Sequence, residues 1–176
     1  MRRTFFIPVS VLMLAGIATY LAAASAHTEA EAAPVFGIKI YPGYRDWKLI
    51  SVAHEAGNLN DIRAVLGNDI AIKSYREGRQ LFPDGAVIAR LSWNFVPSEE
   101  NNKVFGRDQS FVAGSRPDWY LQFMVKDSKK YASTGGWGYA QFDKDGKPAD
   151  EAKLKTCAPC HEPIKARDFV FTKYSP

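Results

Sequence analysis

Apolar and polar residues alternate with a period of two along several short stretches of this chain, a pattern typical of half-buried β-strands. These stretches are rich in β-branched and aromatic residues, and turn residues such as Pro83-Asp84-Gly85 separate them. We predict strands at residues 47–53, 86–96, 120–125 and 137–142, and extended structure in the tail at residues 168–172.

Helical segments are fewer and shorter, and each begins at a residue whose side chain can accept a hydrogen bond from the first turn. Asn68 or Asp69 is predicted to cap a helix that ends at Glu77, and Asp150 to cap a second helix. Residues 97–118 show no periodicity and predict a long connection. Because strands outnumber helices, the predicted class is α+β, a mostly antiparallel β-sheet with a few helices.

The N-terminal residues have the composition of an export signal. Arg2 and Arg3 form a short basic start, an apolar run follows, and Ala24-Ser25-Ala26 offers a small-residue cleavage site. An uncleaved membrane anchor is the alternative, since a membrane span needs about 20 apolar residues. Pro8 interrupts the run, however, and the small-residue exit favours cleavage. We therefore predict a cleaved signal peptide at residues 1–26.

Cleavage would leave a leader at residues 27–40 and a single domain at residues 41–176. The formal net charge of the full chain is +4, and the two arginines of the signal account for part of it. The remaining Lys and Arg residues form no stripe of the kind that follows a phosphate backbone. We therefore expect no nucleic-acid partner.

The motif that carries chemistry lies near the C-terminus, where residues 157–161 read Cys-Ala-Pro-Cys-His. C-x-x-C-H is the attachment signature of c-type haem, because two thiols one helical turn apart can each bond a haem vinyl group while the imidazole reaches the iron. Cys157 and Cys160 are the chain's 2 cysteines. A structural zinc site would need about four ligands, and a thioredoxin-like disulfide lies early in its chain, after a strand.

We therefore predict one covalent haem c, attached near the C-terminus through Cys157 and Cys160, with His161 as iron ligand; a redox disulfide is the alternative. Covalent haem attachment in bacteria takes place outside the cytoplasmic membrane. The export signal and the haem motif therefore both indicate a periplasmic protein.

Few residues are available as a second axial ligand. Met124 and His54 are the candidates inside the domain, and His27 would lie at the start of the mature chain. Packing at the edge of the core is the ordinary role of a methionine in a strand, and a lone histidine is more often hydrogen-bonded at the surface. We therefore predict an open sixth position, which can bind small molecules.

Several segments of the chain resemble the cytochrome P-460 family, which includes the cytochromes c′-β. They are the haem motif, the tail and three upstream segments: residues 157–163, 168–174, 82–85, 125–131 and 135–138. The resemblance implies a mostly antiparallel sheet with a few helices, a homodimer, and a five-coordinate iron with His161 as proximal ligand. Members of the family either oxidise hydroxylamine or bind nitric oxide and related gases.

One position separates these two activities. The hydroxylamine oxidases of the family carry a lysine, on the strand after the Asp-Gly turn, that bonds covalently to the haem. Arg90 occupies the matched position here, and its permanently protonated guanidinium is a poor nucleophile. A surface ion pair or a contact with a haem propionate is the other role open to Arg90. Lys73 is the nearest other lysine, and nothing in its sequence setting suggests a depressed pKa.

The resemblance also implies a pocket over the iron lined by apolar side chains. Trp93, Phe95 and Phe123 are the candidates, although each can equally belong to the ordinary core. The leading function is therefore a periplasmic haem c protein that binds nitric oxide or a related small nitrogen species.

Two alternative functions remain open. The first is an enzyme of the same family that oxidises hydroxylamine, in which Asp150 or Glu151 would act as base near the iron. The second is a simple electron-transfer cytochrome, in which Met124 or His54 would be the sixth ligand and a redox protein would be the partner.

Overall fold

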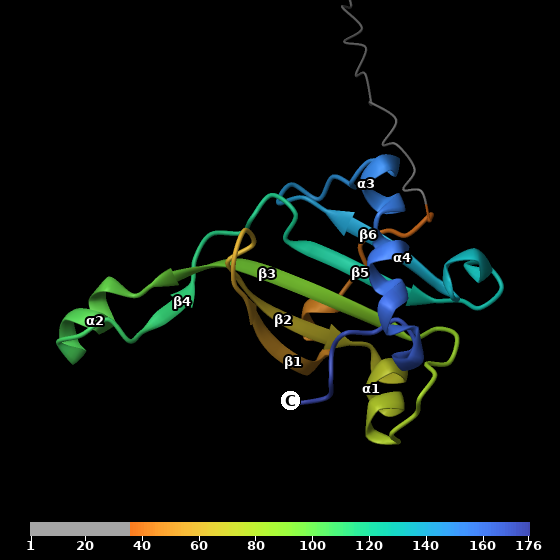
Figure 1. Cartoon of the computed structure of the whole chain (residues 1–176), viewed down its shortest axis with the longest axis horizontal. Coiled ribbons are helices and arrows are strands. Elements are labelled where there is room, and N and C mark those ends of the chain that lie inside the picture. The colour runs from red at the N-terminus through yellow and green to blue at the C-terminus, as the bar shows by residue number, and fades with distance from the viewer. Residues whose placement is uncertain (1–35) are drawn as a thin grey trace, which may run out of the picture. The chain divides into compact units, whose positions relative to one another are not determined.

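The computed structural model describes residues 36–176, and a β-sheet dominates this part of the chain (Figure 1). Its strands pair antiparallel in the order β1–β2–β3–β5–β6, and β4 pairs with the end of β3. Their bounds are β1 Lys48–Glu55, β2 Asp61–Gly67, β3 Val87–Pro97, β4 Phe111–Ala113, β5 Leu121–Lys126 and β6 Trp137–Phe142. The predicted signal peptide lies outside the described residues. No helix between residues 36 and 176 is long and apolar enough to cross a membrane.

Short helices complete the α+β fold, which confirms the predicted class. They are α1 Asp69–Arg76, α2 Glu99–Phe105, α3 Glu151–Lys155 and α4 Cys157–His161, with 3-10 turns at Tyr44–Asp46, Ala132–Thr134 and Glu162–Arg167. Asn68 caps α1, its Oδ1 accepting from Ala71 N at 3.0 Å. Asp150 caps α3 in the same way, accepting from Lys153 N at 2.8 Å. Both helices begin where the sequence predicted.

Two segments carry regular structure that the sequence pattern did not predict. Strand β2 places Asp61 and Arg63 on a covered face of the sheet. Its sequence therefore lacks the alternation of apolar and polar residues by which a strand is predicted. The predicted connection at residues 97–118 contains α2 and β4. Ser98 caps α2 by accepting a hydrogen bond from Asn101 N, and β4 pairs with the last residues of β3. A short helix and a three-residue strand are too brief to show a period.

Residues 168 and 169 are not extended, in contrast to the prediction of extended structure at residues 168–172. Asp168 and Phe169 take left-handed φ values of 50° and 63°, which extended structure does not allow. The chain turns sharply here, and its next residues lie against α1, where Tyr75 Oη donates to Thr172 O at 3.0 Å.

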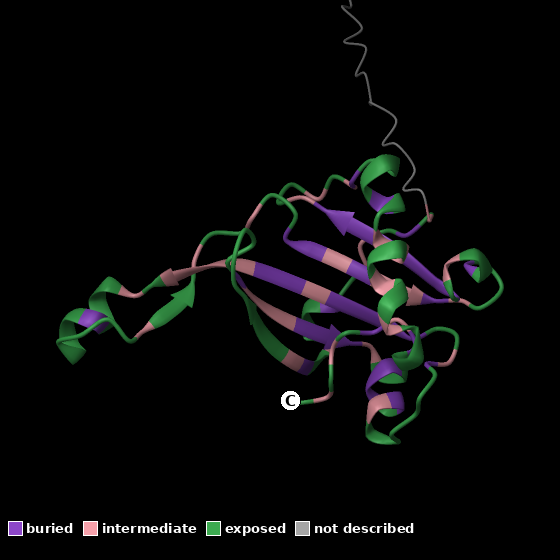
Figure 2. Cartoon of the chain, in the orientation of Figure 1, coloured by how far each residue is buried: buried purple, intermediate pink, exposed green. Residues whose placement is uncertain are grey.

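The sheet has two covered sides, which we name by their neighbours. The helix side packs against α1, α4 and the tail, and its buried residues include Ile88, Trp137 and Tyr139. The opposite side packs against residues 36–47, and its buried residues include Leu91, Leu121 and Phe123. Successive residues of each strand alternate between the two sides. Figure 2 shows buried residues concentrated in β3, β5 and β6, whereas β1, α2 and β4 are mostly exposed.

The last residues of the predicted leader belong to this packing. Ile38 is buried on the opposite side of the sheet. The Tyr131 hydroxyl donates to Phe36 O at 2.9 Å and holds the chain at that point. Residues 36–40 are therefore part of the folded domain.

Candidate functional site

The C-x-x-C-H motif forms α4, which lies on the helix side of the sheet beside β6 (Figure 1). It begins directly after α3, and the two are separate short helices. Cys157 is half-buried against the helix-side core, Cys160 is exposed, and both are free thiols. Burial raises the pKa of the Cys157 thiol. One short helix therefore presents two sulfur atoms and an imidazole together.

The imidazole of His161 is held in a defined orientation. Its Nδ1 lies 2.6 Å from the backbone carbonyl oxygen of Phe169. A carbonyl can only accept, so Nδ1 carries the proton and Nε2 keeps its lone pair. Burial lowers the pKa of His161, and the hydrogen bond to Phe169 partly offsets this. A neutral imidazole with a free Nε2 is the form that ligates iron, and a metal-bound histidine usually donates its other ring N–H to a carbonyl or carboxylate oxygen.

Aromatic rings enclose the sides of this imidazole. The centroid of the His161 ring lies 5.2 Å from that of Tyr139 on β6 and 5.0 Å from that of Phe171 in the tail. The imidazole is therefore fixed by ring packing as well as by its hydrogen bond.

Several polar atoms on the helix side have no hydrogen-bond partner among the described residues. The Tyr139 hydroxyl, Arg90 Nε and Trp137 Nε1 are buried and unpaired. Each can donate a hydrogen bond, and an unpaired buried donor costs about 1–3 kcal/mol. Burial also raises the pKa of Tyr139, which keeps its proton in place for donation. Spare donors beside a two-thiol, one-imidazole helix fit a haem, which carries two propionate acceptors.

Arg90 lies on the helix side, because it shares the face of Ile88 on β3 and pairs with Gln122 of β5. Its guanidinium forms an ion pair with Asp61, whose other oxygen pairs with Arg63. Desolvation and the positive charge of Arg63 lower the pKa of Arg90, but a guanidinium in a protein keeps its proton. Arg90 therefore forms an ion pair, but this pair is largely buried and does not lie at the surface as expected.

The three aromatic residues expected to line a pocket over the iron do not lie beside His161. Phe123 is buried on the opposite side of the sheet, where Trp93 also packs. Phe95 stacks on Phe111 at the base of the β3–β4 extension, with ring centroids 4.6 Å apart. Arg90 and Trp93 are three positions apart, so strand alternation places them on opposite faces. Strand alternation along β3 therefore places Arg90 on one face and Trp93 and Phe95 on the other, a separation that the sequence pattern could have predicted.

The two candidate sixth ligands lie in different places. Met124 is half-buried on the helix side and packs in the same cluster as Cys157. His54 is exposed near the end of β1, where its ring packs on Phe95 and its Nε2 lies 3.4 Å from Asn60 Oδ1. Met124 is therefore the candidate that the fold brings near the motif.

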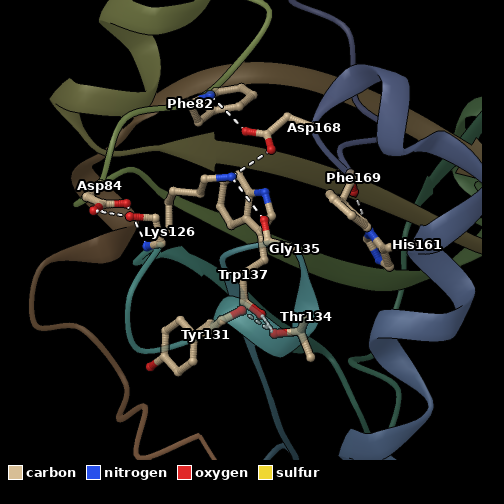
Figure 3. A network of polar contacts seen from close by, with 11 residues as sticks. Phe82, Asp84, Lys126, Tyr131, Thr134, Gly135, Trp137, His161, Asp168 and Phe169 are labelled. Carbon is tan, nitrogen blue, oxygen red and sulfur yellow. Dashed lines mark hydrogen bonds and ion pairs between the residues drawn. The ribbon is translucent and has the colours of Figure 1, made fainter.

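The other charged candidates have ordinary roles in the fold. Asp150 caps α3, and exposed Glu151 pairs with Lys155 at 2.7 Å. Lys73 projects from α1 with 72% of its side chain exposed, and its Nζ lies 3.8 Å from Glu77 Oε1. The lysine that sequence reasoning missed is Lys126, which is buried and pairs with Asp168 close to Phe169 (Figure 3).

A helix with two thiols and a neutral imidazole, facing a sheet with unpaired donors, defines a haem-binding cytochrome. Between residues 36 and 176, no group of three or more His, Cys, Asp or Glu side chains is arranged to hold a metal ion by itself. Residues 41–172 match the family model Cytochrome P460, and the chain belongs to this family of haem proteins. A comparison with curated proteins found no match.

Proposed function

We propose that this chain is a periplasmic haem c protein that binds nitric oxide or a related small nitrogen species at an open iron site. The observation that carries the proposal is the His161 Nδ1 to Phe169 O hydrogen bond, which leaves Nε2 free on the helix that also presents Cys157 and Cys160. One haem would be held through these two thiols, with His161 as proximal ligand. The bound haem would supply a vacant coordination position and one-electron chemistry.

The protein's residues support an open rather than a filled sixth position. His54 lies at an exposed site on β1, among Asn60 and Phe95. Met124, like Cys157, packs against the helix-side cluster, and filling that core is sufficient to explain it. The helix side would hold and orient the haem through donors such as the Tyr139 hydroxyl and Arg90 Nε.

Hydroxylamine oxidation is the less favoured activity of this site. The residue at the position of the family's cross-linking lysine is Arg90, and its guanidinium is committed to Asp61. Lys126, the buried lysine of the helix side, is equally committed to Asp168. Its Nζ is held by that carboxylate and by the backbone oxygen of Gly135. We therefore propose that no bond joins the haem to a lysine.

Export and assembly complete the proposal. The signal at residues 1–26 would direct the chain to the compartment in which haem c is attached. The resemblance to the cytochromes c′-β suggests a homodimer, which light scattering on the purified protein would test.

The experiment is expression with the haem c attachment machinery, followed by mass spectrometry and a ferric absorption spectrum. We expect one added haem, loss of residues 1–26, a high-spin charge-transfer band and spectral change with nitric oxide. The Cys157→Ala/Cys160→Ala variant is the control and should carry no covalent haem. An unmodified mass with a Cys157–Cys160 disulfide would refute the haem proposal.

The same spectrum separates the alternatives. A low-spin ferric spectrum that becomes high-spin in Met124→Leu would assign the protein to electron transfer. A strongly red-shifted Soret band, with a third covalent attachment in the haem peptide, would assign it to hydroxylamine oxidation.

A further inference from the structure

Residues 125–131 and 168–174, two of the segments that resemble the cytochrome P-460 family, meet inside the domain although they lie far apart in the sequence. Lys126 ends β5, and Asp168 lies in the turn that follows the haem helix. Lys126 Nζ lies 2.6 Å from Asp168 Oδ1, and the two side chains are 9% and 3% exposed (Figure 3). A buried ion pair of this kind is costly to form and needs further hydrogen bonds to be tolerated.

Both charges of this pair have those further partners. Lys126 Nζ also donates to Gly135 O at 3.2 Å and lies 5.0 Å from the centre of the Trp137 ring. The second oxygen of Asp168 accepts from Phe82 N at 2.8 Å. The pair therefore connects the tail to the ends of β5 and β6 and to the segment before β3.

Asp168 directly precedes the residue whose carbonyl meets His161. Asp168 and Phe169 both have positive φ, a conformation that costs about 1–2 kcal/mol per residue outside glycine. Such a turn persists where surrounding contacts hold it. Asp168 is held by the ion pair, and the Phe169 ring lies in the space that a side chain at Gly135 would take, since a Cβ there would clash with the ring. The Phe169 carbonyl is thus fixed from both sides.

We propose that Lys126 and Asp168 are positioning residues for the haem ligand: their buried ion pair fixes the Phe169 carbonyl, which sets the tautomer, ring plane and donor strength of His161. The inference rests on the proposed ligation of iron by His161. A firm acceptor on Nδ1 makes Nε2 a stronger donor. The chain therefore tunes the iron through an ion pair that acts on His161 by way of the Phe169 carbonyl.

The test uses the haem-loaded protein and two measurements that a purely structural role would leave unchanged. They are the iron–histidine stretching frequency of the ferrous protein, by resonance Raman, and the reduction potential. Asp168→Asn should lower the frequency and raise the potential, because a looser Phe169 carbonyl weakens the donation of Nε2. Glu151→Gln is the matched control: it breaks an exposed ion pair on the adjacent helix α3 and should leave both values at wild type.

The single variant strands the Lys126 charge in the core and can fail to fold. Lys126→Met/Asp168→Asn removes both charges together, so no buried charge is left without its partner, and we expect it to fold and carry haem. It should show the same downshift in frequency and rise in potential. Wild-type values for both measurements in the double variant would overturn the inference.

Failure of the proposed function would look different. In that case the wild type would carry no covalent haem, or His161→Ala would leave the haem spectrum unchanged. The inference alone fails when a His161-ligated wild type and the double variant give the same frequency and potential.

Discussion

The two sides of the sheet are built from the same strands but treat polar groups differently. On the opposite side, Phe123 is enclosed by the rings of Tyr41 and Tyr44, with centroid distances of 5.4 and 5.5 Å. On the helix side, Tyr139 and Arg90 keep buried donor atoms without partners among residues 36–176. A core that only stabilises has no need of spare donors, since each costs free energy. The comparison indicates that the opposite side stabilises the domain, whereas the helix side has donors available to bind the haem.

The largest effect should come from the opposite side and should leave the haem untouched. Phe123 is 1% exposed, and Phe123→Ala should lower the free energy of unfolding by about 3–5 kcal/mol. Urea denaturation measures this loss, and the absorption spectrum of the folded variant should match wild type. A changed spectrum would show that the two sides are not separate in function.

The next effect comes from the helix side and should reach both stability and spectrum. Asp61 is 4% exposed in its side chain and faces Arg63 and Arg90. Asp61→Asn leaves two largely buried guanidiniums without their shared anion and should cost about 1.5–3 kcal/mol, the value of hydrogen bonds to a charged group. Because Arg90 is then free to move, we also expect a shifted Soret band. Asp69→Asn, which breaks an exposed pair with Lys48, is the control and should change neither value.

A smaller effect should change sign with haem. Tyr139→Phe removes a buried hydroxyl that has no partner in the described chain. In the haem-free Cys157→Ala/Cys160→Ala background, we expect it to be neutral or to stabilise by about 1 kcal/mol. In the haem-loaded protein the hydroxyl should have found an acceptor, and the same substitution should destabilise. Equal effects in both backgrounds would argue against Tyr139 as a haem contact.

The smallest effect belongs to His54. Its ring is exposed on β1 and packs on Phe95. His54→Ala should leave the spin state and the nitric oxide affinity unchanged, as measured by absorption titration. A conversion from low to high spin in this variant would identify His54 as an iron ligand instead.

The sequence alone determined the local features of this protein. Asn68 and Asp150 predict the starts of their helices correctly, because a cap is a contact between residues three positions apart. The Cys157–Cys160 spacing predicts haem chemistry for the same reason, since one helical turn sets the reach of both thiols. Four of the strands were predicted from their β-branched and aromatic residues. β2 was not, because its Asp61 and Arg63 are buried among charged partners on β1 and β3.

Only the tertiary structure decided which distant residues meet. Lys126 and Asp168 are separated by 42 positions, and nothing in either segment by itself names the other as its partner. The side of the sheet on which Arg90, Trp93 and Phe123 lie follows from the pairing register, which packing against α4 and the tail selects. Residues this far apart in the sequence come into contact only when the whole core folds cooperatively. The sequence therefore specified the chemistry of the haem helix, and the fold specified the carbonyl, the ion pair and the unpaired donors that surround it.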